Sequence, residues 1–370
     1  MGDFSTPNIL EYIWLDADGG IRSKIRTLKN HTFKHSSESR GIGNCSIDPD
    51  SVPIWNYDGS STGQGTTARS EVQLIPVKIY HHPFSDDYPT NIKCFVVLCE
   101  TYNGFTDAPL ETNSRHAANV LFNKFQSYQP LYGLEQEFFF FNRNTRHPFE
   151  YSALSSELTN EIKQGLYYCG NGSSAGVERK IMNDFIGRAL NCGLTISGIN
   201  QEVAPSQWEF QVGPALGISA GDHFIMARFI LLRVAEKEDL SIIFHPKPFL
   251  DWNGSGCHVN FSTKQTRQSN GIADIYKIIN IMSSYHQEFV EKLSGKENDK
   301  RLTGGFETSS SDKFTWGVGS RDTSVRIPNQ VEQDKKGYFE DRRPASNLDS
   351  YRVTAELFKF ALIANGENVE

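Results

Sequence analysis

The sequence predicts an α+β protein of two domains: a small domain of short strands, followed by a larger domain in which helices and strands mix. Three observations carry this prediction. The chain has 370 residues, which is long for a single compact core. Hydrophobic residues make up 38% of the chain and aromatic residues 12%, enough to bury a substantial core. The local patterns also change character near residues 105–112.

The first hundred residues predict short strands separated by turns rich in Gly, Pro and Asp. The strands are expected at residues 12–15, 21–28, 71–80 and 94–100. Thr112 or Asn113 can cap a helix that runs to about Tyr128. We therefore expect the domain boundary between residues 105 and 112.

Beyond the boundary, helical and strand patterns alternate. The expected strands cover residues 131–141, 194–211 (as two strands broken at Pro205), 241–244 and 257–262. The expected helices cover residues 176–192, 219–239, 272–293 and a last segment that begins near Ser350. Because this order lacks strict βαβ regularity, it predicts a mainly antiparallel sheet with surrounding helices.

Charge and composition exclude several classes of protein. The net charge of -7 and the pI near 5.8 disfavour a nucleic-acid partner, which needs a basic surface. No apolar run has membrane-spanning length, and residues 1–10 lack the features of a signal peptide. The 6 cysteines have no CxxC spacing, which favours reduced, buried thiols over disulfides or a zinc site. A cytoplasmic protein with no membrane partner is expected.

The first candidate site residues lie in the apolar strand predicted at residues 131–141. Glu135 and Glu137 are two apart, so their side chains point to the same face of that strand. Two like charges in an interior strand are costly unless they are paired or bound to a cation. Taken alone, a pair that faces solvent is the commoner interpretation.

Three further segments repeat this pattern. Pro205 interrupts the strand pattern between Glu202 and Glu209, so two adjacent strands can present one carboxylate each to a common side. His258 lies in a strand between small residues, and Glu340 follows two aromatic residues. Solvent-facing glutamates and a hydrogen-bonded core histidine are the alternatives for each one. Together, five glutamates and one histidine favour Mg²⁺ or Mn²⁺ over thiolate-bound zinc.

No phosphate-binding loop of the GxxxxGK[ST] type is present, and the glycine-rich loop at residues 170–176 lacks the lysine. A bound nucleotide would therefore need metals and side chains to hold its phosphates. The C-terminal third supplies arginines for this purpose: Arg301, Arg321, Arg326, Arg342 and Arg343. Arg321 and Arg326 flank a predicted strand, although ordinary surface arginines are the alternative. Guanidinium groups beside acidic ligands suit phosphoryl transfer to a carboxylate.

Six segments resemble, in order and nearly in spacing, the signature segments of eukaryotic-type glutamine synthetase. They are residues 55–62, 131–141, 202–214, 253–262, 301–304 and 336–344. The resemblance implies an N-terminal β-grasp domain at residues 8–106 and a funnel-shaped catalytic domain at residues 112–370. It implies an ATP-dependent ligase that joins ammonia to L-glutamate through γ-glutamyl phosphate, with Mg²⁺ or Mn²⁺. It also implies a homo-oligomer, a decamer of two pentameric rings with active sites between subunits.

The resemblance further implies a role for each site residue. Glu137, Glu202 and Glu209 would hold the metal near glutamate, and Glu135, His258 and Glu340 the metal near the ATP phosphates. The nucleotide site would comprise Glu135, Glu209, Phe210, Gln211, Val212, Gly213, Pro214, Asn260, Phe261, Ser262, Arg321, Arg326, Tyr338, Phe339 and Glu340. The substrate site would comprise Ser61, Trp252, Asn253, Gly254, Arg301, Arg321 and Arg342.

Four catalytic residues also come from the resemblance. Asp58, supported by Ser61 and supplied by the adjacent subunit, would take a proton from ammonium. Arg321 and Arg326 would stabilise the transferred phosphoryl group. Glu307 would belong to a flap that keeps water from the acyl phosphate.

The chain departs from the family pattern at four positions near these segments. Phe306, Ser320, Asn329 and Asp251 stand where the family usually has histidine, asparagine, arginine and asparagine. None of them is a metal ligand. A related ligase that uses another amine and a non-catalytic structural assembly remain the alternatives. Asp58 argues against the first, and the retained ligands argue against the second. A guanidino kinase lacks the segments at residues 135–137 and 253–256.

Overall fold

A computed structural model gives the fold and describes residues 7–29, 31–35, 45–144, 148, 165–172 and 176–369. The chain divides into two compact units. The first consists of Met1–Ala117, Phe185–Leu194 and Ile225–Ile230, and the second of Ala118–Asp184, Thr195–Phe224 and Leu231–Glu370.

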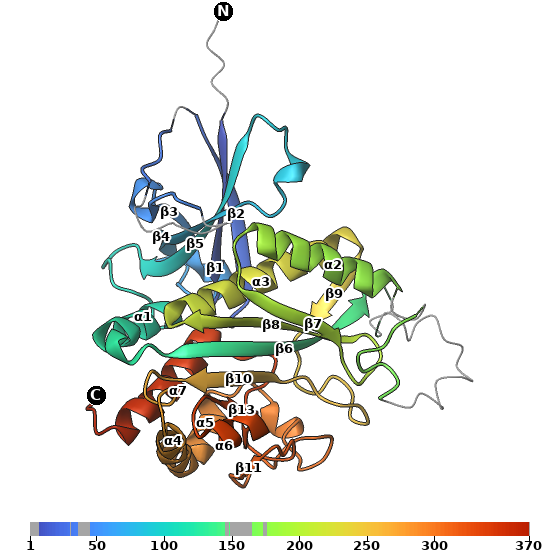
Figure 1. Cartoon of the computed structure of the whole chain (residues 1–370). Helices are drawn as coiled ribbons and strands as arrows, with labels where there is room; N and C mark the ends of the chain where they lie inside the picture. Colours follow the sequence, from blue (N-terminus) through green and yellow to red (C-terminus); the bar gives the residue numbers. More distant parts are fainter. Residues whose placement is uncertain are drawn as a thin grey trace, which may run out of the picture. The chain divides into compact units, whose positions relative to one another are not determined.

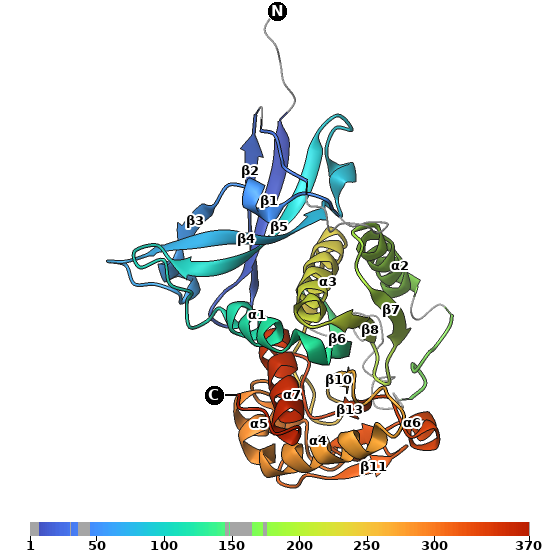
Figure 2. The same cartoon turned by 60° about the vertical axis from the view of Figure 1, so that its left-hand side comes forward.

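The first unit contains a 5-stranded sheet with the order β2-β1-β5-β4-β3 (Figure 2). Its strands are β1 (Asn8–Leu15), β2 (Ile21–Leu28), β3 (Trp55–Asp58), β4 (Glu71–His81) and β5 (Lys93–Asn103). β1 and β5 run parallel, and the other neighbours are antiparallel. Side chains alternate along β4, so Val72 and Leu74 enter a core that also contains Tyr12 and Trp14.

The second unit contains a larger sheet with the order β11-β12-β13-β10-β6-β8-β7, to which β9 adds by pairing with β6 (Figure 1). All its neighbouring strands are antiparallel except β11 and β12. The strands are β6 (Leu131–Asn142), β7 (Ile196–Gln201), β8 (Gln207–Leu216), β9 (Leu240–Ile243), β10 (Cys257–Ser262), β11 (Trp316–Val318), β12 (Val325–Ile327) and β13 (Phe339–Asp341).

The helices are α1 (Ser114–Lys124), α2 (Gly176–Asn191), α3 (Ile218–Lys237), α4 (Ile272–Ser284), α5 (His286–Lys292), α6 (Asn329–Asp334) and α7 (Ser350–Ala364). In both overall views α4, α5 and α7 lie together on one side of the larger sheet (Figures 1 and 2). Asp349 caps α7 by accepting hydrogen bonds from the backbone N–H groups of Tyr351 and Arg352. The Tyr132 hydroxyl of β6 donates to the carbonyl of Thr354, which fixes α7 on the sheet.

The α+β class, with a small N-terminal sheet and a larger second one, is confirmed. The strand expected at 257–262 is β10, and most of the other expected strands and helices differ by a few residues at their ends. The short strand β3 was not predicted, because half of Trp55–Asp58 is Asn and Asp, which are rare in strands. The domain limits at residues 8–106 and 112–370 stay predictions.

Three sequence predictions need correction. The helix expected at 272–293 is two helices, because the chain breaks at Tyr285 after a Ser-Ser pair whose Ser284 hydroxyl bonds back to the Asn280 carbonyl. The strand expected between Arg321 and Arg326 covers only Val325–Ile327. Residues before it form a bend, in which the Thr323 hydroxyl bonds the Ser320 carbonyl.

The third correction concerns the cysteines. All six thiols are free, but Cys169 is exposed and Cys45 only partly buried, so the expectation of buried thiols holds for the other four. The glycine-rich loop at 170–176 lies in part outside the described residues. None of the helices in the described part of the chain combines the length and the apolar character needed to cross a bilayer.

Candidate active site

The central strand β6 carries two of the predicted site residues. Glu135 and Glu137 point to one face, and Gln136 between them is fully buried on the other. The Gln136 amide donates to the Glu137 carbonyl at 2.7 Å and to the Ser346 carbonyl at 3.1 Å. The two glutamates are therefore fixed by the backbone of β6, and each one meets a different group of partners.

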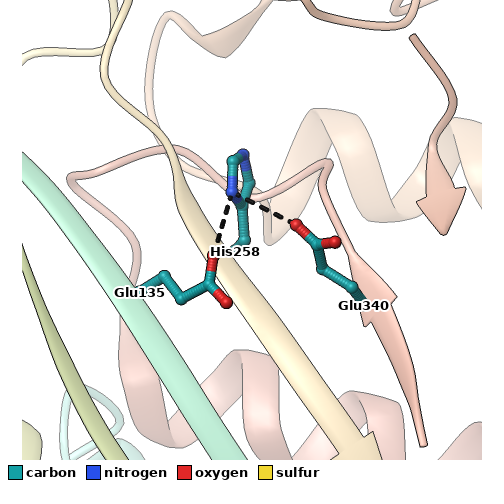
Figure 3. A group of neighbouring side chains, drawn as sticks. All are labelled: Glu135, His258 and Glu340. Atoms are coloured by element: carbon teal, nitrogen blue, oxygen red, sulfur yellow. Dashed lines mark ion pairs between the residues drawn. The ribbon is translucent and has the colours of Figure 1, made fainter. Parts of the chain in front are cut away.

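Glu135, His258 and Glu340 form the first group, called here the Glu135 cluster. They come from the neighbouring strands β6, β10 and β13, and His258 stands directly opposite Glu135 in the β6–β10 register. Nδ1 of His258 lies 3.5 Å from one oxygen of each glutamate. Figure 3 shows the imidazole between the two carboxylates. One ligand atom from each residue lies within 4.8 Å of the other two.

Polar neighbours orient the ligands of the Glu135 cluster. The Asn260 amide donates to Glu135 at 2.7 Å, and Arg342 and Arg326 donate to Glu340 at 2.6 and 3.3 Å. Burial, together with the charge of Arg342, holds the pKa of His258 well below its usual value. A neutral imidazole is the form that binds a metal.

Glu137, Glu202 and Glu209 form the second group, the Glu137 cluster, whose ligand atoms also lie within 4.8 Å of one another. Glu137 and Glu209 are directly opposite in the β6–β8 register. Glu202 follows β7 in the turn to β8, and its backbone N–H bonds the Gln207 carbonyl. Pro205 lies in this turn. Glu202 and Glu209 reach a common side as the sequence predicts, but only Glu209 comes from a strand, because β7 ends at Gln201.

Each carboxylate of the Glu137 cluster has hydrogen-bond donors, but they do not offset the repulsion. The Gly256 N–H donates to Glu137 at 2.7 Å, and the Asn200 amide donates to Glu202 at 2.9 Å. Burial, and then the charge of Glu202, raises the pKa of Glu137 to about 8. Burial also raises the pKa of Glu202 to about 7, and that of Glu209 far above its usual value, with a further contribution from neighbouring glutamates.

The donor atoms of both clusters fit a hard divalent cation. The Glu137 cluster offers only carboxylate oxygens, and the Glu135 cluster offers oxygens and one imidazole nitrogen. Mg²⁺ and Mn²⁺ accept such ligands, and no cysteine belongs to either group. A cation would also offset the burial and the repulsion that together raise the carboxyl pKa values of the Glu137 cluster.

A pocket of about 440 Å³ adjoins the Glu135 cluster. Its wall includes these residues predicted to bind nucleotide: Glu135, Gln211, Val212, Gly213, Pro214, Asn260, Phe261, Ser262 and Tyr338. Phe210 and Phe339 are instead fully buried in the core. A Cβ on Gly213 would lie 2.3 Å from the Tyr132 carbonyl, and its φ is +117°, so only glycine fits this wall.

Two arginines, Arg342 and Arg326, converge on Glu340. Besides bonding Glu340, Arg342 donates through Nε to the Arg321 carbonyl at 3.2 Å and through Nη2 to the Glu307 carbonyl at 3.3 Å. Arg326 bonds the other oxygen of Glu340. Arg343, in contrast, is fully buried against Asp341 at 2.8 Å and stacks on Phe289, so it stabilises the fold behind the site.

Arg301, one of the residues predicted to bind glutamate, is 3% exposed. Its Nη2 donates to three successive carbonyls of residues 342–344, and burial lowers its pKa to about 10. A Cβ on Gly254 would lie 2.6 Å from the Arg301 side chain, so this loop and the arginine approach closely. The Gln207 amide bonds both the Gly254 carbonyl and Glu137, which connects the loop with Asn253 and Gly254 to the Glu137 cluster.

Asp58 and Ser61 belong to the first unit, whereas the other predicted site residues belong to the second. Asp58 ends β3 and caps the short turn Gly59–Thr62. Its carboxylate is exposed, and hydrogen bonds from the Ser60 hydroxyl and N–H lower its pKa. Ser61 also donates to Asp58, at 3.3 Å.

Sequence reasoning missed four residues next to the site. Arg267 and Ser197 line the pocket, and Arg267 donates to the Ser262 hydroxyl at 2.9 Å. Tyr168 is hydrogen-bonded to Arg321. The fourth, Glu178, is fully buried under Trp208, whose indole N–H donates to it at 2.7 Å, and burial raises its pKa to about 7. Lone residues of these types, outside the motifs, give no pattern to recognise.

Two candidate cation sites on one sheet, with arginines and a pocket beside them, are the arrangement expected of a metal-dependent enzyme that handles anionic substrates. The family model described as glutamine synthetase, catalytic domain, matches residues 112–292. A homologue from Acanthamoeba polyphaga mimivirus is 45% identical over 95% of this chain and 93% of its own length. The glutamine synthetase of Colletotrichum gloeosporioides is 42% identical over 94% of this chain and 90% of its own.

A third relative, named glutamine synthetase cytosolic isozyme 1-1 in Oryza sativa subsp. japonica, is 40% identical over 98% of this chain and 96% of its own. The similarity therefore spans both units and nearly the whole of each relative. The chain belongs to the glutamine synthetase family.

Proposed function

We propose that the chain catalyses the ATP-dependent ligation of ammonia to L-glutamate, with L-glutamine, ADP and phosphate as products. The observation that carries the proposal is the placement of the two clusters. One strand, β6, contributes a carboxylate to each cluster, and the pocket with the predicted nucleotide residues adjoins the Glu135 cluster. The names of the relatives, glutamine synthetases over nearly their full length, support the same reaction.

The two clusters would hold Mg²⁺ or Mn²⁺, with Glu135, His258 and Glu340 at one ion and Glu137, Glu202 and Glu209 at the other. When bound, these ions neutralise phosphate and carboxylate charge and align the reacting groups. The oxygen-rich donor set suits a hard cation, and both Mg²⁺ and Mn²⁺ meet that requirement. Residues of the pocket wall would hold the nucleotide beside the Glu135 cluster.

The reaction proceeds in two steps. The γ-carboxylate of glutamate attacks the terminal phosphorus of ATP, ADP leaves, and γ-glutamyl phosphate results. Arg321 and Arg326 would contact the transferred group, and Arg301 and Arg342 would contact the glutamate carboxylates. Ammonia then attacks the activated carbonyl carbon, and phosphate leaves.

Ammonia reaches the enzyme mostly as ammonium at pH about 7, so a carboxylate must bind the cation and accept its proton. We assign this role to Asp58, with Ser61 beside it. Hydrogen bonds from Ser60 lower the pKa of Asp58, which keeps the carboxylate charged and suited to a cation. In the proposed assembly, a decamer of two pentameric rings, a neighbouring subunit supplies Asp58 to each site. A cytoplasmic location is supported by the name of the rice relative.

The test is a complete reaction with purified full-length chain, glutamate, ATP, ammonium and Mg²⁺. We expect glutamine, ADP and phosphate in equal amounts, and loss of all three when glutamate is omitted. ADP and phosphate release that persists unchanged without ammonium would contradict the proposal. Ethylamine in place of ammonium tests the related ligase, which would use the larger amine at least as well. Mn²⁺ replaces Mg²⁺ in a parallel series.

A further inference from the structure

The loop at residues 303–310, called here the flap loop, carries the predicted flap residue Glu307. Its base is fixed by a bridge between Thr303 and Ser310 and by the bond from the Ser311 N–H to the Leu302 carbonyl at 2.9 Å. The residues from Thr303 to Glu307 are exposed. The tip therefore depends on a few specific contacts for its position.

The backbone at the tip adopts a conformation that L-residues rarely adopt. Phe306 has φ of +52° and Glu307 has φ of +60°, and neither is glycine. Two consecutive residues in the left-handed region are strained, and such strain persists only where other contacts hold the chain. The bond from Arg342 to the Glu307 carbonyl is one of these contacts.

The second contact joins Phe306 to a buried lysine. The ammonium of Lys247 lies 3.8 Å from the centroid of the Phe306 ring and donates to the Trp252 carbonyl at 2.5 Å. Lys247 is 6% exposed, and its burial lowers its pKa, which the neighbouring Asp251 charge opposes. A desolvated cation over an aromatic face is the stronger form of this interaction.

We infer that Lys247 and Phe306 form a latch that fixes the position of Glu307 and connects the flap loop to the loop with Trp252 and Gly254. Both are positioning residues, because they act through Glu307 and through the loop predicted to bind glutamate. The latch rests on the proposed function, since exclusion of water matters only when an acyl phosphate forms. Phe306 is also one of the positions at which the chain departs from the family pattern.

The latch affects whether the acyl phosphate reacts with ammonia or with water. Without the aromatic ring the strained tip loses one of the contacts that hold it, and it opens more often. The contacts that remain include the bond from Arg342 to the Glu307 carbonyl and the bond from the Thr308 hydroxyl to the Arg301 carbonyl at 3.0 Å. Water can then cleave γ-glutamyl phosphate to glutamate and phosphate, so ATP is consumed without amide formation. The ratio of phosphate to glutamine therefore reports on the latch, and a change in fold stability alone would not alter it.

Four variants test the latch. Phe306→Leu removes the aromatic face, Lys247→Met removes the cation, and Phe306→Tyr keeps the aromatic face. Lys277→Met is the control, since Lys277 is exposed on α4 and pairs with Asp274. Hydrogen exchange of the backbone amides at 303–310 is measured without substrates. It should be about tenfold faster than in the parent in Phe306→Leu and Lys247→Met, and close to the parent rate in Phe306→Tyr and Lys277→Met.

The second measurement is the phosphate-to-glutamine ratio at limiting ammonium. We expect it to rise several-fold in Phe306→Leu and Lys247→Met and to return to the parent value in Phe306→Tyr. Unchanged amide exchange in Phe306→Leu overturns the latch. Faster exchange with an unchanged ratio overturns the role in positioning Glu307. A parent protein that makes no glutamine overturns the proposed function, and the exchange data still decide whether the latch exists.

Discussion

Replacing Glu137 with glutamine should stabilise the metal-free protein and weaken its response to metal. Glu137 is one of three carboxylates that repel one another, of which Glu209 is buried and the other two are partly buried, and burial with the Glu202 charge raises its pKa to about 8. A glutamine side chain keeps the shape and can still accept the hydrogen bond from the Gly256 N–H. It removes one charge that the cluster needs for a cation.

The size of the effect follows from the pKa. A carboxyl with an ordinary pKa of 4.5 is charged in the unfolded chain at pH about 7, whereas Glu137 keeps its proton in the metal-free folded protein. Each pH unit between these values costs about 1.36 kcal/mol, on the order of 3 kcal/mol in total. For a protein of this size, Glu137→Gln should raise the melting temperature in EDTA on the order of 5 °C.

The assay is thermal unfolding in EDTA and in Mn²⁺, with Glu288→Gln as the matched control because Glu288 is exposed on α5 and pairs with Lys292. In EDTA the Glu137→Gln variant should melt above the parent. In saturating Mn²⁺ the melting temperature of the parent should rise more than that of the variant, so that the parent melts at the higher temperature, because metal binding stabilises the folded state. If Glu137→Gln melts lower than parent in EDTA and gains as much from Mn²⁺, the reasoning is refuted.

Three further predictions concern the same reaction and its groups. The raised pKa values of Glu137 and Glu202 mean that the metal-free folded protein binds extra protons, so its unfolding free energy falls as pH rises from 4.5 toward 8. Mn²⁺ competes with those protons. The Mn²⁺-induced rise in melting temperature should therefore be larger near pH 8 than near pH about 5.5, and an equal rise at both would count against the cation site. Asp58→Asn should lower glutamine formation by about 10²–10⁴-fold while leaving the Mn²⁺ shift unchanged, and a turnover within about twofold of the parent would exclude Asp58 as the proton acceptor. Arg267→Ala should raise the KM for ATP on the order of tenfold with a smaller change in kcat, as steady-state kinetics would show, whereas an unaltered KM would place the nucleotide elsewhere.

The strands of the candidate site could be predicted because charge and hydropathy conflict in them. Glu135 and Glu137 stand in an apolar strand, and such a conflict is informative without any structure. The order of strands could not be predicted, because pairing between residues far apart in sequence leaves no local pattern. That His258 stands opposite Glu135, and Glu209 opposite Glu137, follows only from the register of β6 with its neighbours.

Other features were hidden for physical reasons. The break at Tyr285 depends on a side-chain bond to the backbone that competes with the helix, and helical periodicity continues across it. Lys247 has the sequence appearance of a surface lysine, and its burial against Trp252 and Phe306 is a tertiary effect. Glu178 gave no signal for a similar reason, since its partner Trp208 lies thirty residues away.

The extended backbone of β6 sets the distance between the two clusters. Because Glu135 and Glu137 are two residues apart on one extended strand, their backbone positions are separated by about 7 Å, and no side-chain movement can change that distance. One inserted residue between them would turn one carboxylate to the opposite face and remove it from its proposed cation site, while leaving most of the sheet intact. Substitutions in this enzyme can thus change the residues around the two clusters far more easily than the distance between the clusters.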